Sequence, residues 1–243
     1  MAKAPHSKKE RVAKNPLCKL LIEYQNGIRQ YAKRLIQQYE QDSQFNCMDS
    51  LSEKRDDFKD QMRKASGTAE GWAQAVSEVL TIELLKEGLK KRVGGKWAPP
   101  DEDRLYWSGM VKKKELRIRP RVKQGSFRPD VTITLEGRIV AIVETKSSFE
   151  GPREIQEWVS RLHDTVKGLR PPARPLVAIV CYGHHWKGGR VRALRRPDNL
   201  CFVCASHLVR FQKSNPVVPS SEILGFEPCD VPNLVDAIGR MFH

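Results

Sequence analysis

Hydrophobic positions change their period near residue 100 of this chain. At residues 68–91 they cover most of the circumference of a predicted helix, so this helix should be central in the fold. At residues 17–39 they recur at spacings of four and three, which predicts a helix that packs on its own domain or, alternatively, forms a dimer seam. Another helix is predicted from Ser50, where Glu53 completes a capping box and Phe58 lies on the buried side together with Leu51 and Met62.

Beyond residue 100 the apolar period falls to two, which is typical of β-strands. After a long loop from residue 94, we expect strands at residues 116–122, 130–135, 139–146, 176–181 and 200–205. We expect helices opening at Pro152 and, capped by Asp230 and Pro232, near the C-terminus. The run at 176–181 is almost entirely apolar and should be covered on both faces. The order predicts an α/β (α+β) fold with a central mixed sheet flanked by helices.

The chain is strongly basic, with 43 Lys and Arg residues against 29 Asp and Glu and a formal net charge of +14. A surplus of this size favours a polyanionic partner, above all nucleic acid. No stretch reaches the roughly 20 apolar residues of a membrane span, and the basic N-terminus lacks a signal-peptide core, so we expect a cytoplasmic protein without a membrane partner. Cys201-Phe-Val-Cys204 has the form of a zinc knuckle, but its apolar setting favours a buried strand with the two thiols on opposite faces.

Three polar residues stand at the ends of the two central strands. If residues 136–138 connect these strands, Leu135 faces Ile139, Ile133 faces Ala141 and Val131 faces Val143, all on one side. Asp130 then faces Glu144, and Lys146 lies beyond on the same side. A two-residue turn at Glu136-Gly137 would instead pair Asp130 with Val143, so the apolar pairing favours the register that joins the carboxylates.

Pro129-Asp130, followed after thirteen residues by Glu144-Thr145-Lys146, resembles the motif of the PD-(D/E)xK nuclease superfamily, which includes the type II restriction endonucleases. In that superfamily the Asp starts one strand and the Glu and Lys end the next, and the order of elements matches residues 68–182 of this chain. The resemblance implies a restriction-endonuclease-like core. Residues 67–243 would be the nuclease domain, residues 16–66 a helical N-terminal elaboration in one compact unit with it, and residues 1–15 a flexible basic arm.

The chemistry of phosphodiester hydrolysis needs these residue types. Asp130, Glu144 and the backbone carbonyl of Thr145 offer hard oxygen ligands for Mg²⁺, for which Mn²⁺ should substitute. Lys146 would bind the phosphate and orient a water molecule, and its electrostatic role is firmer than a role as a base. The alternative is that Asp130 caps a turn and that Glu144 and Lys146 form a surface ion pair.

The central helix supplies a further candidate ligand, because many superfamily members place a Glu there. Glu78 and Glu83 both qualify, since each falls among apolar positions of the helix. Glu78 lies ten residues before Gly88, which resembles the family's spacing to the glycine that ends this helix, and Glu78 is therefore preferred. The alternative for either residue is an ion pair with a nearby Lys or Arg.

Basic residues before and after these strands predict a DNA-binding surface. Alternate residues of a strand share a face, so Arg117, Arg119 and Arg121 could follow a phosphate backbone, unless they only protect a solvated strand edge. A glycine-hinged loop near residue 185 could read bases in a groove. The further candidates for DNA contact are Lys123, Arg128, Ser147, Lys187, Arg190, Arg192 and Arg195.

These features favour a Mg²⁺-dependent type II restriction endonuclease that cuts double-stranded DNA at a short specific sequence in the prokaryotic cytoplasm. Such an enzyme would be a homodimer, because a palindromic site requires two active sites related by a two-fold axis, and it would act beside a cognate DNA methyltransferase. One alternative is a repair or junction-resolving nuclease of the same superfamily. Another is a non-catalytic DNA-binding protein that keeps the nuclease fold.

Overall fold

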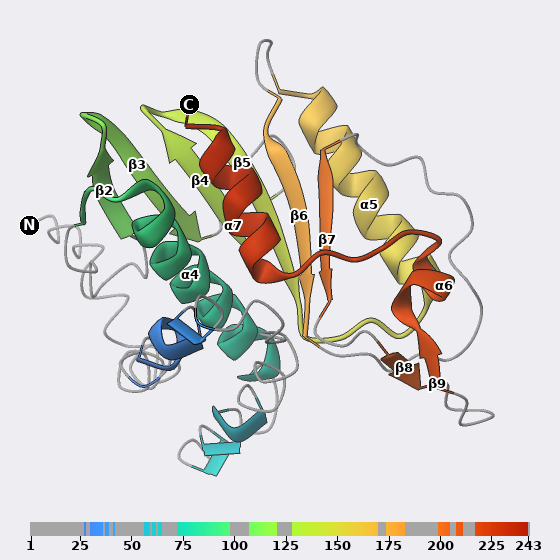
Figure 1. Ribbon diagram of the computed structural model, residues 1–243. Coiled ribbons are helices and arrows are strands. Elements are labelled where there is room, and N and C mark those ends of the chain that lie inside the picture. Colours follow the sequence, from blue (N-terminus) through green and yellow to red (C-terminus); the bar gives the residue numbers. More distant parts are fainter. Residues whose placement is uncertain are drawn as a thin grey trace, which may run out of the picture.

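The computed structural model describes two parts of the chain. The first consists of short helical pieces between residues 27 and 64, namely 27, 30–35, 37–38, 41, 56–58, 60–61 and 63–64. The second consists of residues 72–97, 107–120, 128–169, 174–182, 199–204, 208–210 and 217–242. Within these residues the chain forms an α/β fold in which helices flank a seven-stranded mixed sheet (Figure 1).

The strands follow one another across the sheet in sequence order. The first five are antiparallel neighbours, whereas β5, β6 and β7 run parallel. Their bounds are β1 (Lys96–Trp97), β2 (Trp107–Val111), β3 (Lys114–Pro120), β4 (Val131–Leu135), β5 (Arg138–Lys146), β6 (Leu176–Cys181) and β7 (Leu200–Cys204). The mixed sheet and the five predicted strands, which correspond to β3 to β7, are therefore confirmed.

The loop predicted from residue 94 contains the strand β1, and β2 was not predicted; together they extend the sheet beyond β3. A two-residue strand is too short to show a period. The second strand, WSGMV, contains Gly109, whose missing side chain makes room for Trp97. A Cβ atom on Gly109 would lie 2.9 Å from Cδ2 of Trp97. This contact joins two segments whose hydrophobic patterns are weak.

Helices cover both faces of the sheet (Figure 1). One face carries α4 (Trp72–Val93) and α7 (Val231–Arg240), which lie side by side, and the other carries α5 (Pro152–Lys167) and α6 (Ser220–Leu224). A separate two-stranded sheet is formed by β8 (Leu208–Arg210) and β9 (Val217–Pro219). Asp230 caps α7 as predicted, since its side chain accepts a hydrogen bond of 2.9 Å from the Asn233 N–H.

Across the described residues, no helix has the length and apolar content that crossing a membrane requires.

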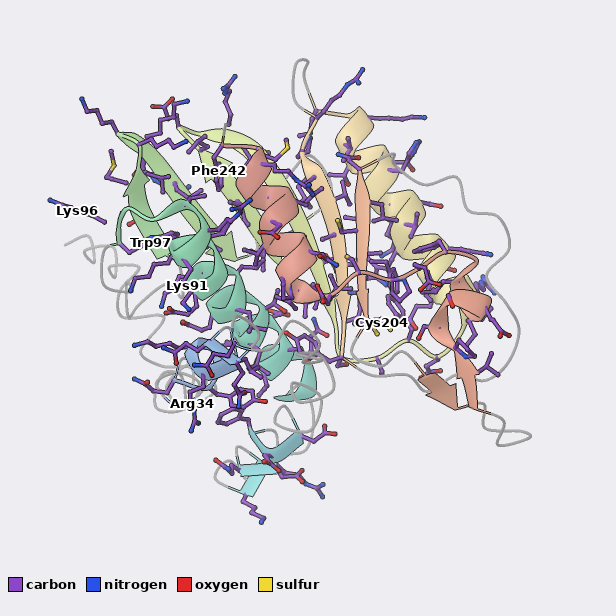
Figure 2. The ribbon with its side chains drawn as sticks, viewed as in Figure 1. Arg34, Lys91, Lys96, Trp97, Cys204 and Phe242 are labelled. Carbon is purple, nitrogen blue, oxygen red and sulfur yellow. The ribbon has the colours of Figure 1, made fainter. Side chains whose placement is uncertain are left out.

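The hydrophobic core is divided by the sheet into two clusters, as strand alternation requires. In β6, Leu176, Ala178 and Val180 face α4 and α7, whereas Val177, Ile179 and Cys181 face α5. The prediction that this strand is covered on both faces is confirmed. Phe242 at the end of α7 belongs to the first cluster and Cys204 of β7 to the second (Figure 2). Cys201 packs on the first cluster, so the two thiols of the CFVC segment do lie on opposite faces.

The N-terminal pieces pack on this same chain. Leu35 and Phe58 are buried in the α4-side cluster, and the rings of Tyr31 and Phe58 meet edge to face at 6.3 Å. The described part of the helix predicted at residues 17–39 therefore packs on its own domain, as expected. The rest of the N-terminal predictions concern residues that lie outside the described ones. These are the arm 1–15 and the helix positions Leu17, Leu21, Tyr24, Ile28, Ser50, Leu51, Glu53 and Met62.

Gly88 lies inside α4 and does not end it, because the helix continues to Val93. This corrects the assignment made from the spacing to Glu78. The physical role of Gly88 is close helix packing: a Cβ atom there would lie 2.6 Å from Cγ2 of Val235 on α7.

The β4–β5 hairpin sets the register of the polar strand ends. Its connection is a two-residue turn in which Glu136 and Gly137 both have positive φ, of 50° and 77°. Leu135 therefore pairs with Arg138, and the predicted pairing with Ile139 was wrong. A β-bulge then leaves Val140 without a partner on β4, and Ile133 pairs with Ala141 and Val131 with Val143 as predicted.

The bulge is also visible in the core. Val140 and Ala141 are consecutive, yet both belong to the α4-side cluster, whereas Ile139 and Ile142 pack on the α5 side. One extra residue has compensated for the shorter turn, and the register at the far end of the hairpin is the one that the apolar pairing predicted.

Candidate active site

Asp130 and Glu144 are brought together by the strand register. Because Val131 pairs with Val143, the residue just before β4 lies opposite Glu144 on β5. The Asp130 N–H donates to Glu144 Oε2 at 3.4 Å, and the Thr145 N–H donates to Asp130 Oδ2 at 2.9 Å. Both carboxylates are buried, with 9% and 2% of their surface exposed. The two acids thus form one buried cross-strand pair.

A cleft of about 530 Å³ opens over this pair. Its lining comes from α4, from the start of β4, from the end of β5 and from α5. The lining residues are Gln74, Glu78, Arg128, Asp130, Glu144, Lys146, Ser147, Ser148, Glu154 and Trp158. The cleft therefore collects the predicted acids, the predicted lysine and one predicted helix carboxylate in a single place.

The pKa values of the two acids are raised chiefly by burial. Burial, followed by the charges of Glu144 and Glu78, raises the pKa of Asp130 to about 7, against the opposing effects of the Thr145 N–H and of Lys146. Burial also raises the pKa of Glu144, against the opposing charge of Lys146. A carboxylate destabilised in this way gains from any cation that enters the cleft.

Lys146 is held between a carboxylate and an aromatic ring. Its Nζ lies 2.7 Å from Glu144 Oε1 and 3.3 Å from the centroid of the Trp158 ring on α5. The side chains of Lys146 and Glu144 are only 13% and 3% exposed, so this ion pair is buried at the cleft and is not a surface pair. Trp158 lies on the helix that was predicted to open at Pro152. Its place under the ammonium group has no signature in the sequence.

Gln74 is a second residue that sequence reasoning missed. It lies on the first turns of α4, and its side-chain amide hydrogen-bonds to groups on α4, β4 and β5. The available signal was weak: Gln74 and Glu78 are four apart and share a helix face, but a glutamine on a helix is most often a solvated residue. Only the tertiary fold shows that this face meets the strand ends.

The two candidate helix acids have different surroundings. Glu78 lines the cleft, with 8% of its surface exposed. Glu83 is fully buried, does not belong to the cleft lining, and has Oε2 at 3.6 Å from Lys86 Nζ. Lys86 also contacts Glu87. Glu83 is thus part of a buried charge cluster further along α4, which is the alternative stated above for one of these acids.

Of the residues predicted to contact DNA, two line the cleft. Arg128 is exposed at its edge, and Ser147 follows Lys146. Arg117 and Arg119 project from the face of β3 opposite the buried Leu116 and Ile118, as predicted, but they do not line the cleft, and Arg117 pairs with Glu115 at 2.5 Å. The remaining candidates lie outside the described residues: Arg121, Lys123, Lys187, Arg190, Arg192 and Arg195.

The donor set fits a hard divalent cation. No group of three His, Cys, Asp or Glu side chains placed to hold a metal ion occurs among the described residues. Mg²⁺ does not need one, because it is commonly bound by one or two carboxylates and keeps several water ligands. Asp130 and Glu144, together with the Thr145 carbonyl, offer two carboxylates and one carbonyl, and burial raises the pKa of both carboxyls, so a bound cation would favour their ionised forms.

A buried network of hydrogen bonds holds Thr145 in place through its side chain. Thr145 Oγ1 donates to Thr81 Oγ1 at 3.3 Å, and Thr81 Oγ1 shares a hydrogen bond of 2.9 Å with the Tyr182 hydroxyl. Thr81 also donates to the Ser77 carbonyl at 2.8 Å. These contacts tie the end of β5 to the middle of α4 and fix the backbone from which the candidate ligands project.

Comparison with protein-family models, with curated protein sequences and with solved structures gives no match to this chain.

Proposed function

We propose that this chain is a Mg²⁺-dependent endonuclease of double-stranded DNA, built on a restriction-endonuclease-like core and acting as a type II restriction enzyme. One observation carries the proposal: Asp130 and Glu144 meet across two antiparallel strands, in the same cleft as Lys146. Two carboxylates and a lysine at the ends of neighbouring strands are the arrangement that the PD-(D/E)xK resemblance requires.

Asp130, Glu144 and the Thr145 carbonyl would hold the Mg²⁺ ion, which supplies charge stabilisation at the phosphate and lowers the pKa of a bound water molecule. Lys146 provides the positive charge that binds a phosphate oxygen and orients the attacking water. Glu144 and the Trp158 ring hold the lysine in place, so that it needs little reorganisation when the substrate enters.

DNA is the substrate that the charge distribution supports. The whole chain carries a net charge of +14, although the centre of the cleft is acidic. Arg128 stands exposed at the edge of that acidic centre. A basic chain with an acidic cleft that offers ligands to a cation is suited to a polyanion that is held by its backbone and cut at one phosphate. A homodimer and a cognate methyltransferase belong to this proposal as partners.

The test is to incubate the full chain with phage DNA in Mg²⁺ and in EDTA. We expect discrete Mg²⁺-dependent fragments, which Asp130→Asn abolishes while DNA binding in a gel-shift assay remains. Asp236→Asn is the matched control, because Asp236 is exposed on α7, away from the cleft, and pairs with the exposed side chain of Arg92. A smear or nicked products would favour a repair nuclease, and retarded but uncut DNA would favour a binding protein.

A further inference from the structure

The Gln74 side chain connects the elements that form the cleft. Its Nε2 donates to the Thr145 carbonyl at 2.8 Å, to Glu78 Oε1 at 3.2 Å and to Asp130 Oδ2 at 3.4 Å. Its Oε1 accepts the Ser147 N–H at 3.2 Å. One amide therefore bridges α4 to the start of β4 and to the residues that end and follow β5.

The amide orientation is fixed by its partners. The Ser147 N–H is a donor, so the oxygen of Gln74 must face it, and the nitrogen must face the opposite side. An amide NH₂ has two hydrogens, whereas three oxygen atoms approach this nitrogen. Three oxygens that converge on one hydrogen-bond donor group, two of them from carboxylates, form the surroundings that a hard cation prefers.

Two of these three oxygens belong to the groups proposed to hold the metal ion, namely Asp130 and the Thr145 carbonyl, and the third belongs to Glu78. We propose, on the basis of the proposed function, that the Gln74 amide takes the place of the cation in the metal-free protein and is displaced from these oxygens when a divalent cation binds. Gln74 is then a positioning residue. It keeps the carboxylates together against their repulsion and lowers the apparent affinity for the cation by competing with it.

This competition has a measurable consequence. The hydrogen bonds from Gln74 to charged acceptors stabilise the metal-free state, and a cation must displace them to bind. Removing them should therefore tighten cation binding about tenfold. Gln74→Met keeps the length of the side chain and removes both polar atoms. Gln74→Glu keeps an oxygen acceptor for the Ser147 N–H and removes the NH₂. Comparing the two variants therefore distinguishes the effect of losing the donor from the effect of losing the acceptor.

The experiment is a titration of the full chain with Mn²⁺ alone, without DNA, followed by calorimetry and by the electron paramagnetic resonance signal of free Mn²⁺. We expect Gln74→Met to bind Mn²⁺ about tenfold more tightly than the wild type, and Gln74→Glu more tightly still because it adds a charge. Gln156→Met on α5, whose side chain does not line the cleft, is the matched control and should not change the affinity. Melting in EDTA at pH 8 checks that each variant folds and should place Gln74→Met below the wild type.

Unchanged or weaker Mn²⁺ binding in both Gln74 variants would overturn the inference. If the wild type still binds Mn²⁺ and Asp130→Asn does not, the proposed metal site survives that result, and only the role of Gln74 is lost. If the wild type binds no Mn²⁺ and Asp130→Asn behaves identically, the proposed function and the inference both fail.

Discussion

Removing the charge of Asp130 should stabilise the metal-free protein at alkaline pH. Burial and the neighbouring acids raise the pKa of this carboxyl from 3.8 to about 7, so the folded state holds its proton more tightly than the unfolded chain does. Between these two pKa values the folded state binds more protons, and the free energy of unfolding must fall as the pH rises. Above pH 7 the full free-energy cost of ionising the buried Asp130 carboxyl is present, and below pH 4 this cost is absent.

The size of the effect follows from the two pKa values. A difference of this extent corresponds to about 4 kcal/mol once Asp130 is fully ionised. Asp130→Asn keeps an oxygen that can accept the Thr145 N–H and removes the charge. We therefore expect the variant to be more stable than the wild type by up to about 4 kcal/mol at pH 8 in EDTA, and by nothing near pH 4.

The assay is urea unfolding at a series of pH values, with Asp236→Asn as the exposed control, which should change the stability by less than about 0.5 kcal/mol. Excess Mg²⁺ should reduce the difference, because the cation binds the folded wild type and stabilises it by mass action. A variant that is equal to or less stable than the wild type at pH 8 would refute the reasoning. It would mean that the hydrogen bonds received by the Asp130 carboxylate outweigh its desolvation.

Three further changes test other contacts. Gly88→Ala places a Cβ atom 2.6 Å from Val235 Cγ2 and should lower the urea-unfolding stability by about 1–3 kcal/mol, with part of the loss recovered when Val235→Ala is added. Thr81→Val removes the hydroxyl that joins Thr145 to Tyr182 and should cost about 1–3 kcal/mol in the same assay, whereas Thr81→Ser should restore most of the stability. Trp158→Leu removes the ring beneath Lys146 and should slow DNA cleavage by roughly 2- to 30-fold, whereas Trp158→Phe should keep most of the rate; equal rates in both variants would contradict this role for the ring.

The strands around the cleft were predictable because their burial is simple. The strands β5, β6 and β7 pack apolar residues against helices on both faces, and uninterrupted apolar runs such as Leu176–Cys181 reflect that environment directly. The strands β1 and β2 were not predictable, since Lys96–Trp97 is too short for a period and Gly109 replaces a side chain with space for a ring. Short edge strands depend on neighbours far along the chain more than on their own pattern.

The site was predictable where one strand pair determines it, and not where several elements meet. Asp130, Glu144 and Lys146 could be placed together from the register of a single hairpin. Gln74 and Trp158 could not, because their positions depend on how α4 and α5 lie against the strand ends. Glu78 and Glu83 are similar in sequence context, and only the tertiary fold separates the cleft from the buried cluster around Lys86.

The pairing of Asp130 with Glu144 depends on the bulge at Val140. The stretch of β5 between the turn and Ala141 has one residue more than its partner stretch on β4. If Val140 were kept but paired regularly, with the same turn, Ile133 would face Val140 and Asp130 would face Val143, so the two acids would emerge from opposite faces of the sheet. Deleting Val140 should instead remove the bulge and leave Asp130 opposite Glu144, because the pairs on both sides of Val140 then follow one another without a break. The geometry of the site depends in this way on a backbone irregularity in a segment that does not touch it.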